Sequence, residues 1–217
     1  EGLYCGQKQI FLRFAGCNLA CAYCDEPAAA DRAGAAEMSC DAVFSAVTAS
    51  AAKNGATAVS LTGGEPLLNW RFIRALAPAL KRSGLSVHLE SNGVLYRELD
   101  KVKNVISVIA ADIKLPSATG GKSLWREHAR FIASAPEKSF LKVVLTRATV
   151  ISDVKKAVDL AAEIRGDIPF FLQPATPRPA RVMPPCGDFV EKAERYAVSR
   201  LSCVRVLPQQ HPLWGVR

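Results

Sequence analysis

At 217 residues, with 49% apolar and 22% charged residues, the chain has the composition of a globular protein with one substantial core. No apolar run approaches the roughly 18 residues that a membrane span needs, so we predict no membrane segment. The net charge is +8, but Lys and Arg are scattered, with no basic run longer than two residues. We therefore expect a small anionic substrate rather than nucleic acid.

The first residues, EGLYCGQKQIF, lack a starting Met and show no basic region followed by an apolar core. They do not have the pattern of a signal peptide, and we expect that further residues of the native chain precede them. Seven cysteines, an odd number, do not suit a secreted disulfide framework. We predict a single cytoplasmic domain over residues 1–217.

Short aliphatic and β-branched runs alternate along the chain with stretches of helical period. The predicted strands are 9–14, 58–62, 86–90, 105–113, 140–146, 169–173 and 203–208. The predicted helices are 39–53, 69–82, 122–134, 152–164 and 188–200, with Ser39, Asn69, Ser152 and Asp188 marking four of the starts. Because the strands are apolar throughout, as a parallel sheet buried on both faces requires, the predicted fold class is α/β with a mostly parallel sheet.

Unusual residues follow the ends of these strands. Residues 17–25 follow the first strand, 63–66 the second and 91–93 the third, while Asp112 and Lys114 end the fourth and Gln173 and Pro174 the sixth. In parallel α/β folds the loops at the carboxyl ends of the strands build the active site. We expect these loops to share one ligand.

Three cysteines in the first of these loops, Cys17, Cys21 and Cys24, have C-x₃-C-x₂-C spacing. A structural zinc site takes four ligands, so three thiols indicate a metal site with one open position. Thiolates suit iron-sulfur clusters, and a 4Fe-4S cluster held by three cysteines leaves one iron without a protein ligand. The alternatives are a zinc knuckle or three incidental cysteines. The other cysteines, Cys5, Cys40, Cys186 and Cys203, have no ligand spacing.

This spacing after a first strand, with the aromatic Tyr23 before the last cysteine and a TGGEP segment at 62–66, resembles the radical S-adenosylmethionine (radical SAM) superfamily. The resemblance implies that the open iron chelates S-adenosylmethionine, whose cleavage yields a 5′-deoxyadenosyl radical. It also implies that Gly63, Gly64 and Glu65 hold the methionyl end. Glycines allow a backbone to approach a ligand closely.

A closer resemblance, to the 7-carboxy-7-deazaguanine synthase family of the queuosine pathway, covers nearly the whole chain. The segments that carry it are EGLYCGQKQIFLRFAGCN (1–18), TGGEP, ESNG (90–93), LKVV (141–144), LQP (172–174) and RVLPQQHPLWGVR (205–217). It implies a shortened partial TIM barrel, a cluster-binding loop after the first strand, homodimers and a flavodoxin-type reductant. The implied reaction contracts the ring of 6-carboxy-5,6,7,8-tetrahydropterin to 7-carboxy-7-deazaguanine with loss of ammonia.

The same resemblance implies roles for single residues. Substrate contacts fall on Glu1, Gly2, Arg13, Thr62, His211 and Arg217, and cofactor contacts on Tyr23, Gln173 and Pro174 as well as the glycines. Arg suits a substrate carboxylate, because a guanidinium binds it with two hydrogen bonds. His88 and His128 are predicted to be structural.

The chain departs from the family pattern at two places. Where many members have Thr or Ser as a magnesium ligand, it has Glu26, a possible but longer ligand for magnesium. Where the family usually has Ser-Pro-Lys, it has Asp112-Ile113-Lys114, which resembles the cofactor-contacting Asp-x-Lys of glycyl-radical activating enzymes. Two alternatives therefore stay open: another radical enzyme of that kind, and a non-catalytic metal-binding module.

Overall fold

The structure, a computed structural model, describes residues 2–177 and 182–208. Seven strands form one sheet in which every neighbouring pair is parallel and the spatial order follows the chain. They are β1 (Gln9–Phe14), β2 (Ala58–Gly63), β3 (Ser86–Ser91), β4 (Val108–Asp112), β5 (Ser139–Leu145), β6 (Phe170–Pro174) and β7 (Val204–Val206). All seven predicted strands are confirmed, although β4 begins later than the predicted residue 105.

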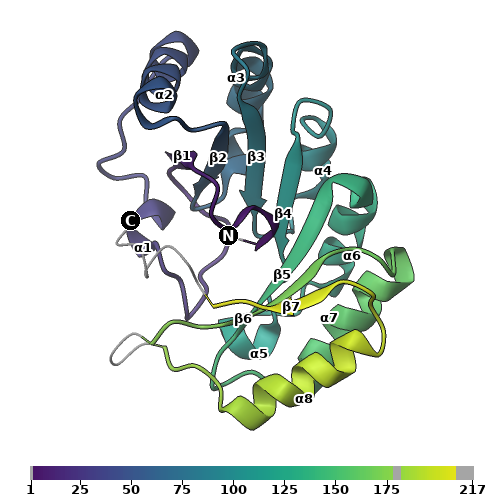
Figure 1. Cartoon of the computed structure of the whole chain (residues 1–217). Coiled ribbons are helices and arrows are strands. Elements are labelled where there is room, and N and C mark those ends of the chain that lie inside the picture. The colour runs from purple at the N-terminus through teal and green to yellow at the C-terminus, as the bar shows by residue number, and fades with distance from the viewer. Residues whose placement is uncertain (1, 178–181, 209–217) are drawn as a thin grey trace.

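Helices fill the connections between the strands (Figure 1). They are α1 (Pro27–Ala30), α2 (Cys40–Asn54), α3 (Trp70–Arg82), α4 (Tyr96–Asp100), α5 (Pro116–Thr119), α6 (Trp125–Ser134), α7 (Ile151–Ile164) and α8 (Gly187–Val198), with 3₁₀ turns η1 (Gly2–Tyr4), η2 (Pro66–Asn69) and η3 (Pro136–Lys138). The five predicted helices are present, and the sequence pattern missed α1, α4 and α5 because each is only four or five residues long.

The predicted helix starts are correct in part. Ser39 caps α2 with its side chain. Ser152 and Asp188 were expected at starts but lie inside the first turns of α7 and α8, whose N-cap positions are two residues earlier. Asn69 precedes α3, but its side chain makes no capping bond, because the turn of η2 runs directly into the helix.

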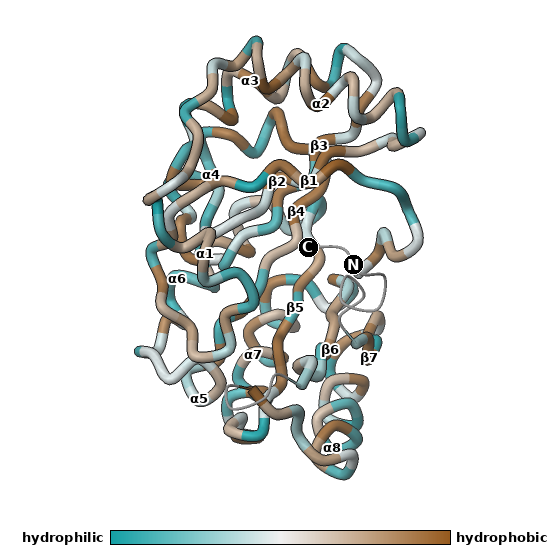
Figure 2. The backbone as a smooth tube through the Cα atoms, turned by 90° about the vertical axis from the view of Figure 1, so that its left-hand side faces the viewer, coloured by the Kyte–Doolittle hydropathy of each residue, from teal (hydrophilic) through white to brown (hydrophobic). Residues whose placement is uncertain are grey.

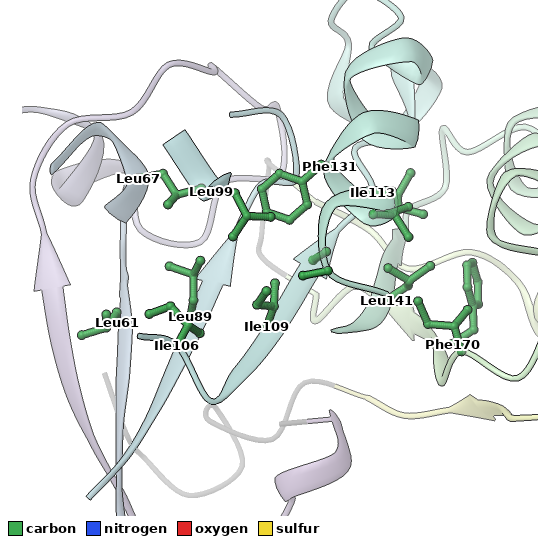
Figure 3. Packing of buried hydrophobic residues seen from close by; sticks show 14 of the residues in the cluster. Leu61, Leu67, Leu89, Leu99, Ile106, Ile109, Ile113, Phe131, Leu141 and Phe170 are labelled. Atoms are coloured by element: carbon green, nitrogen blue, oxygen red, sulfur yellow. The ribbon is translucent and has the colours of Figure 1, made fainter. Parts of the chain in front are cut away.

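Alternate residues of each strand face opposite sides of the sheet, and the two sides differ in chemistry. One side packs against the helices through fully buried residues (Figure 3). Leu61, Leu89 and Ile109 stand in register on neighbouring strands, and Leu141 on β5 pairs with Ala111 on β4. Much of the backbone of the strands is brown, that is apolar, in Figure 2. The other side carries polar and charged residues. The expectation of strands that are apolar on both faces is therefore wrong for this inner side.

The sheet is an open, partial barrel. Within the described residues β1 pairs only with β2, and β7 only with β6. The turn η1 lies against the inner side, where Tyr4 stacks on His88 with ring centroids 4.4 Å apart and Gly2 packs against Phe140. This architecture confirms the α/β partial barrel with the cysteine loop after the first strand. Across the described residues, none of the helices combines the length and the apolar character needed to span a membrane.

Candidate active site

A cavity of about 160 Å³ opens at the carboxyl ends of the strands, on the inner side of the barrel. Six strands each contribute one inward-facing polar side chain to its wall: Arg13, Thr62, Glu90, Asp112, Lys142 and Gln173. The register places Arg13 beside Thr62 and Asp112 beside Lys142. A wall with charges of both signs fits a ligand that carries both hydrogen-bond donors and an anionic group.

The three clustered cysteines line the same cavity. Cys17, Cys21 and Cys24 are half-buried, and the N–H of Cys24 donates to the carbonyl of Cys21 at 3.0 Å, which folds the loop into a turn. Burial raises the pKa of the Cys21 and Cys24 thiols. The seven cysteines all lie in the described part of the chain, and none of them is in a disulfide.

This donor set fits a cluster better than a single ion. Within the described residues, no set of three His, Cys, Asp or Glu side chains is grouped closely enough to hold one metal ion. In a cubane, by contrast, each thiolate ligates a different iron, so the sulfurs surround the cluster rather than meet at one point. Three soft donors around one cavity, with space beside them, therefore fit a 4Fe-4S cluster.

The glycine pair after β2 holds the cysteine loop in place. A Cβ on Gly64 would lie 2.2 Å from the carbonyl oxygen of Gly16, and one on Gly63 would lie 2.1 Å from that of Phe14. The N–H of Gly64 donates to Phe14, and that of Glu65 donates to Gly16. Only glycine permits this contact, so the pair docks two backbones together in addition to lining the cavity.

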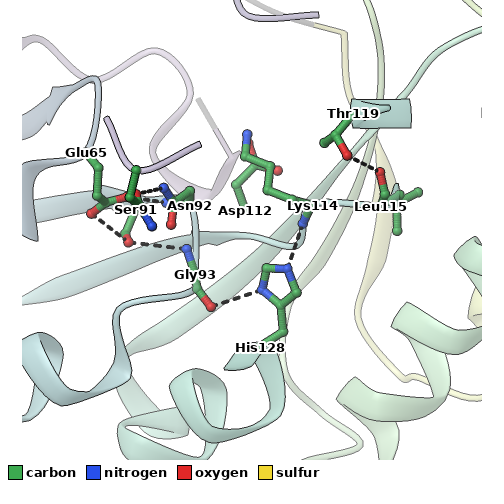
Figure 4. A network of polar contacts seen from close by, with 10 residues as sticks. Glu65, Ser91, Asn92, Gly93, Asp112, Lys114, Leu115, Thr119 and His128 are labelled. Atoms are coloured by element: carbon green, nitrogen blue, oxygen red, sulfur yellow. Dashed lines mark hydrogen bonds and ion pairs between the residues drawn. The ribbon is translucent and has the colours of Figure 1, made fainter. Parts of the chain in front are cut away.

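Glu65 was expected to contact the cofactor, but it is fully buried and is not among the residues that line the cavity. Its carboxylate instead accepts a hydrogen bond from the N–H of Leu67 at 3.1 Å. It also accepts from the hydroxyl of Ser91 at 3.0 Å and from the N–H of Asn92 at 2.8 Å (Figure 4). Burial raises its pKa to about 7 despite these bonds. These contacts give Glu65 a positioning role, and its contact to the cofactor stays a prediction.

The next link of this network reaches the cysteine loop. The side-chain amide of Asn92 donates to Oδ1 of Asn18 at 2.7 Å, and Asn18 is the neighbour of Cys17. Oδ1 of Asn92 is itself buried without a partner among the described residues. Because a buried acceptor is costly to leave unsatisfied, this atom fits a contact to a bound ligand.

Asp112 and Lys114 form an ion pair in the cavity wall, with Nζ of Lys114 2.8 Å from Oδ2 of Asp112. Burial alone would lower the pKa of Lys114, but Asp112 and Tyr23 raise it well above its usual range. Nζ also lies 5.1 Å from the centre of the Tyr23 ring, a cation–π contact. Oδ1 of Asp112 is buried without a partner among the described residues, so the acid keeps an acceptor for a ligand hydroxyl or amine.

His128 helps to position this ion pair by binding the backbone of Lys114. Its Nδ1 lies 3.0 Å from the carbonyl oxygen of Gly93, and its Nε2 accepts from the N–H of Lys114 at 3.1 Å (Figure 4). Since a carbonyl only accepts and an amide N–H only donates, the ring is neutral with its proton on Nδ1. Burial lowers its pKa to about 4. The structural role predicted for His128 agrees with this geometry.

Arg13 is the candidate carboxylate-binding residue, and in this structure it pairs with Glu26. A guanidinium nitrogen of Arg13 lies 3.4 Å from Oε1 of Glu26, and both side chains are about 30% exposed at the cavity wall. Glu26 thus has a cation as its partner in this structure, and its neighbour Asp25 lines the same cavity. A magnesium site at Glu26 stays a prediction.

Most of the predicted site residues meet in this cavity. Its wall contains Cys17, Cys21, Cys24, Tyr23, Gly63, Gly64, Asp112, Lys114, Gln173, Arg13, Thr62 and Glu26. Pro174 is not among the lining residues, and Gly2 packs below, against Phe140. Glu1, His211 and Arg217 lie outside the described residues. Sequence reasoning missed Glu90 and Lys142, although single charges inside apolar strands were a signal that could have found them.

Comparisons with known proteins agree with this geometry. Residues 12–163 match the family model of the radical SAM superfamily. The chain is 33% identical to the 7-carboxy-7-deazaguanine synthase of Geobacter sulfurreducens over 99% of its length and 92% of the relative's. It is 31% identical to that of Methanopyrus kandleri over 98% of its length and 88% of the relative's.

Solved structures support the fold alone. Streptococcus suis SuiB bound to S-adenosylmethionine superposes with a TM-score of 0.65 at 16% identity, covering 93% of this chain and 50% of that one. A structure of TYW1 with a lysine-pyruvate adduct gives a TM-score of 0.61 at 16% identity, covering 87% and 72%. With the fold, the cysteine loop and these relatives in agreement, the chain belongs to the radical SAM superfamily and, within it, to the 7-carboxy-7-deazaguanine synthase family.

Proposed function

We propose that the protein converts 6-carboxy-5,6,7,8-tetrahydropterin into 7-carboxy-7-deazaguanine and ammonia. Substrate and product differ by one ammonia, so the net reaction needs no oxidant. The observation that carries the proposal is a single cavity lined by three thiols, by an arginine and by acids that face it. Reductive cleavage of S-adenosylmethionine at a bound 4Fe-4S cluster would supply the radical chemistry, and the protein supplies position and protection from water.

Arg13 and Glu90 suit the two ends of such a substrate. The guanidinium of Arg13 can bind the carboxylate with two hydrogen bonds. The carboxylate of Glu90 is held by the hydroxyl of Ser60 at 2.6 Å and lines the cavity, where it can accept from the N–H groups of a pterin ring. Thr62, beside Arg13 in the sheet, offers a hydroxyl between them.

Asp112 and Lys114 suit the cofactor. Oδ1 of Asp112, which has no partner among the described residues, can accept hydrogen bonds from ribose hydroxyls. Oδ2 of Asp112 lies 2.8 Å from Nζ of Lys114 and pairs with its charge. Tyr23, Gly63, Gly64 and Gln173 complete this end of the wall. Cys17, Cys21 and Cys24 would hold the cluster as thiolates, which requires that the protons of buried thiols leave on cluster binding.

The test is an anaerobic assay of reconstituted protein with dithionite, S-adenosylmethionine and the carboxy-tetrahydropterin. Both 5′-deoxyadenosine and the deazaguanine are followed by mass spectrometry, in the wild type and in Cys21→Ala. We expect both products from the wild type and neither from the variant. Deoxyadenosine without deazaguanine would leave the radical chemistry standing and overturn the substrate, which would favour an activity like that of the glycyl-radical activating enzymes.

Other expectations accompany this proposal. We propose that the protein acts in the cytoplasm as a homodimer, with a flavodoxin-type reductant and with neither nucleic acid nor membrane as a partner. Light scattering of the purified protein tests the dimer. A magnesium requirement is not part of the proposal, because Glu26 is paired with Arg13.

A further inference from the structure

Cations gather around two aromatic rings on the outer wall of the barrel, where α3, α4 and α6 meet. Arg71, Arg74 and Lys101 lie 4.5, 5.3 and 4.3 Å from the centre of the Trp70 ring. Arg97 and Arg130 lie 5.8 and 5.2 Å from the centre of the Tyr96 ring. All five cations are exposed. We call these seven residues the Trp70–Tyr96 surface.

The segment that contains the Trp70–Tyr96 surface carries more positive charge than its length would suggest. Residues 66–135 contain eleven Lys and Arg against five Asp and Glu, in a chain whose net charge is +8. Glu90, Asp112 and Lys114 line the internal cavity, which leaves ten Lys and Arg against three Asp and Glu outside it.

Lys101 has an acid partner, with its Nζ 3.9 Å from Oε1 of Glu98, but no ion pair of the described residues involves Arg71, Arg74, Arg97 or Arg130. Because like charges placed side by side repel one another, a partner of opposite charge would stabilise this cluster.

The surface is joined to the cysteine loop by short contacts. Asn18, next to Cys17, accepts from the side chain of Asn92, whose N–H donates to Glu65. Glu65 in turn accepts from the N–H of Leu67 in η2, which leads directly into Trp70. The start of α3 is therefore linked through η2 and Glu65 to the loop that carries Cys17.

We infer that the Trp70–Tyr96 surface docks a small acidic electron-transfer protein that reduces the cluster. This inference rests on membership of the radical SAM superfamily and not on the pterin as substrate. The chemistry requires that one electron pass from a donor to the cluster, so that the donor is oxidised as the cluster is reduced. An acidic donor would be drawn to this face by charge, with an association rate that falls as salt is added.

Nucleic acid fits the surface less well. Proteins that bind single strands use aromatic faces open for base stacking. Here cations lie over both rings, with Lys101 4.3 Å from the centre of the Trp70 ring and Arg130 donating a hydrogen bond to the hydroxyl of Tyr96 at 2.7 Å. The rings hold the cations in place instead of offering their faces to a base.

The experiment compares the reconstituted wild type with the triple variant Arg71→Glu, Arg74→Glu, Lys101→Glu. A matched control carries Lys155→Glu, Lys192→Glu and Arg195→Glu, three exposed cations on α7 and α8. Reduction of the cluster is followed by stopped-flow absorbance, first with dithionite and then with purified, fully reduced flavodoxin at increasing concentration and at two salt concentrations.

We expect all three proteins to react alike with dithionite, and the triple variant alone to need at least tenfold more flavodoxin and to lose its salt dependence. Equal flavodoxin dependence in the variant and the wild type would overturn the inference. So would equal losses with both reductants. Because cluster reduction needs no pterin, this result is independent of whether the proposed substrate is correct.

Discussion

At the scale of single residues, Glu65 shows how a site residue can act without touching a ligand. Its carboxylate joins the loops after β2 and β3 by accepting from Leu67, Ser91 and Asn92. The TGGEP segment made Glu65 visible in the sequence, but its partners stand up to 27 residues away. A motif therefore identified the residue, while its role depended on tertiary contacts that local pattern does not encode.

Replacing Glu65 by Gln is expected to destabilise the protein by about 1–3 kcal/mol, because an amide nitrogen cannot accept and one buried donor loses its partner. Thermal and chemical unfolding measure this loss. Glu163→Gln, on α7, is the matched control and should change stability little. An unchanged free energy of unfolding in Glu65→Gln would contradict the positioning role.

Glu26 gives a second prediction at this scale, which rests on the proposed substrate. Because Glu26 occupies Arg13 in the structure, an anionic ligand must compete with it. Glu26→Gln should therefore bind 6-carboxypterin several-fold more tightly without magnesium. Arg13→Gln should bind it roughly tenfold or more weakly, the loss expected for a charged hydrogen bond. Quenching of the fluorescence of the pterin measures both affinities.

Weaker binding by Glu26→Gln would show instead that Glu26 contributes its own contact to the ligand. Magnesium should leave the affinity of the wild type unchanged. A magnesium effect that disappears in Glu26→Gln would restore this residue as a metal ligand.

At the scale of elements, the close contact between the cysteine loop and the end of β2 decides the shape of the site. Strand and helix periods predicted every long element, because those periods are local properties of the sequence. They did not predict why Gly63 and Gly64 must be glycines. A Cβ at these positions would lie only 2.1 and 2.2 Å from backbone oxygens of the neighbouring segment. The prediction of Ser152 and Asp188 as N-caps was wrong for a similar reason, since a polar residue suits the first turn of a helix as well as the N-cap.

Gly64→Ala should displace the cysteine loop, because its Cβ would clash with the backbone oxygens of Gly16 and Ala29. These oxygens cannot move away unless the backbone that carries them moves too. We expect a large loss of iron and sulfide after reconstitution, with the sheet still folded by circular dichroism. Gly166→Ala, where nothing lies within 4 Å, serves as the control. Full cluster content in Gly64→Ala would show that this contact is dispensable.

At the scale of the whole molecule, the barrel separates an apolar exterior row, covered by helices, from a polar interior. The fold class could be predicted because alternation of strands and helices leaves few other topologies. The polar inner side could not, since Glu90 and Lys142 became site residues only when six strands were placed around one cavity. Buried ionisable groups also act at this scale, because they make the free energy of unfolding depend on pH.

His128 and Glu65 should affect the pH dependence of stability in opposite directions. The pKa of His128 falls from 6.5 to about 4 on folding, so its contribution is lost as pH drops from 6.5 toward 4. The pKa of Glu65 rises from 4.5 to about 7, so its contribution is present below pH 4.5 and lost as pH rises to 7.

The variant His128→Gln isolates the first effect, because its side chain does not titrate. Between pH 6.5 and 4, its free energy of unfolding should fall less steeply than that of the wild type, by up to about 1.4 kcal/mol per pH unit for one proton. Unfolding in urea across this range measures the difference. Parallel curves for the two proteins would mean that folding does not shift the pKa of His128.

The sequential order of the strands also bears on how the protein is made. The hydrogen bonds that fix the cysteine loop come from Phe14, Gly64, Glu65, Asn92 and Thr119, all in the first 119 residues. A nascent chain that has left the ribosome as far as α5 already contains each of those partners, whereas the strands that carry Lys142 and Gln173 have yet to emerge. The loop for the cluster can thus take its shape during translation, before the wall that faces it is complete.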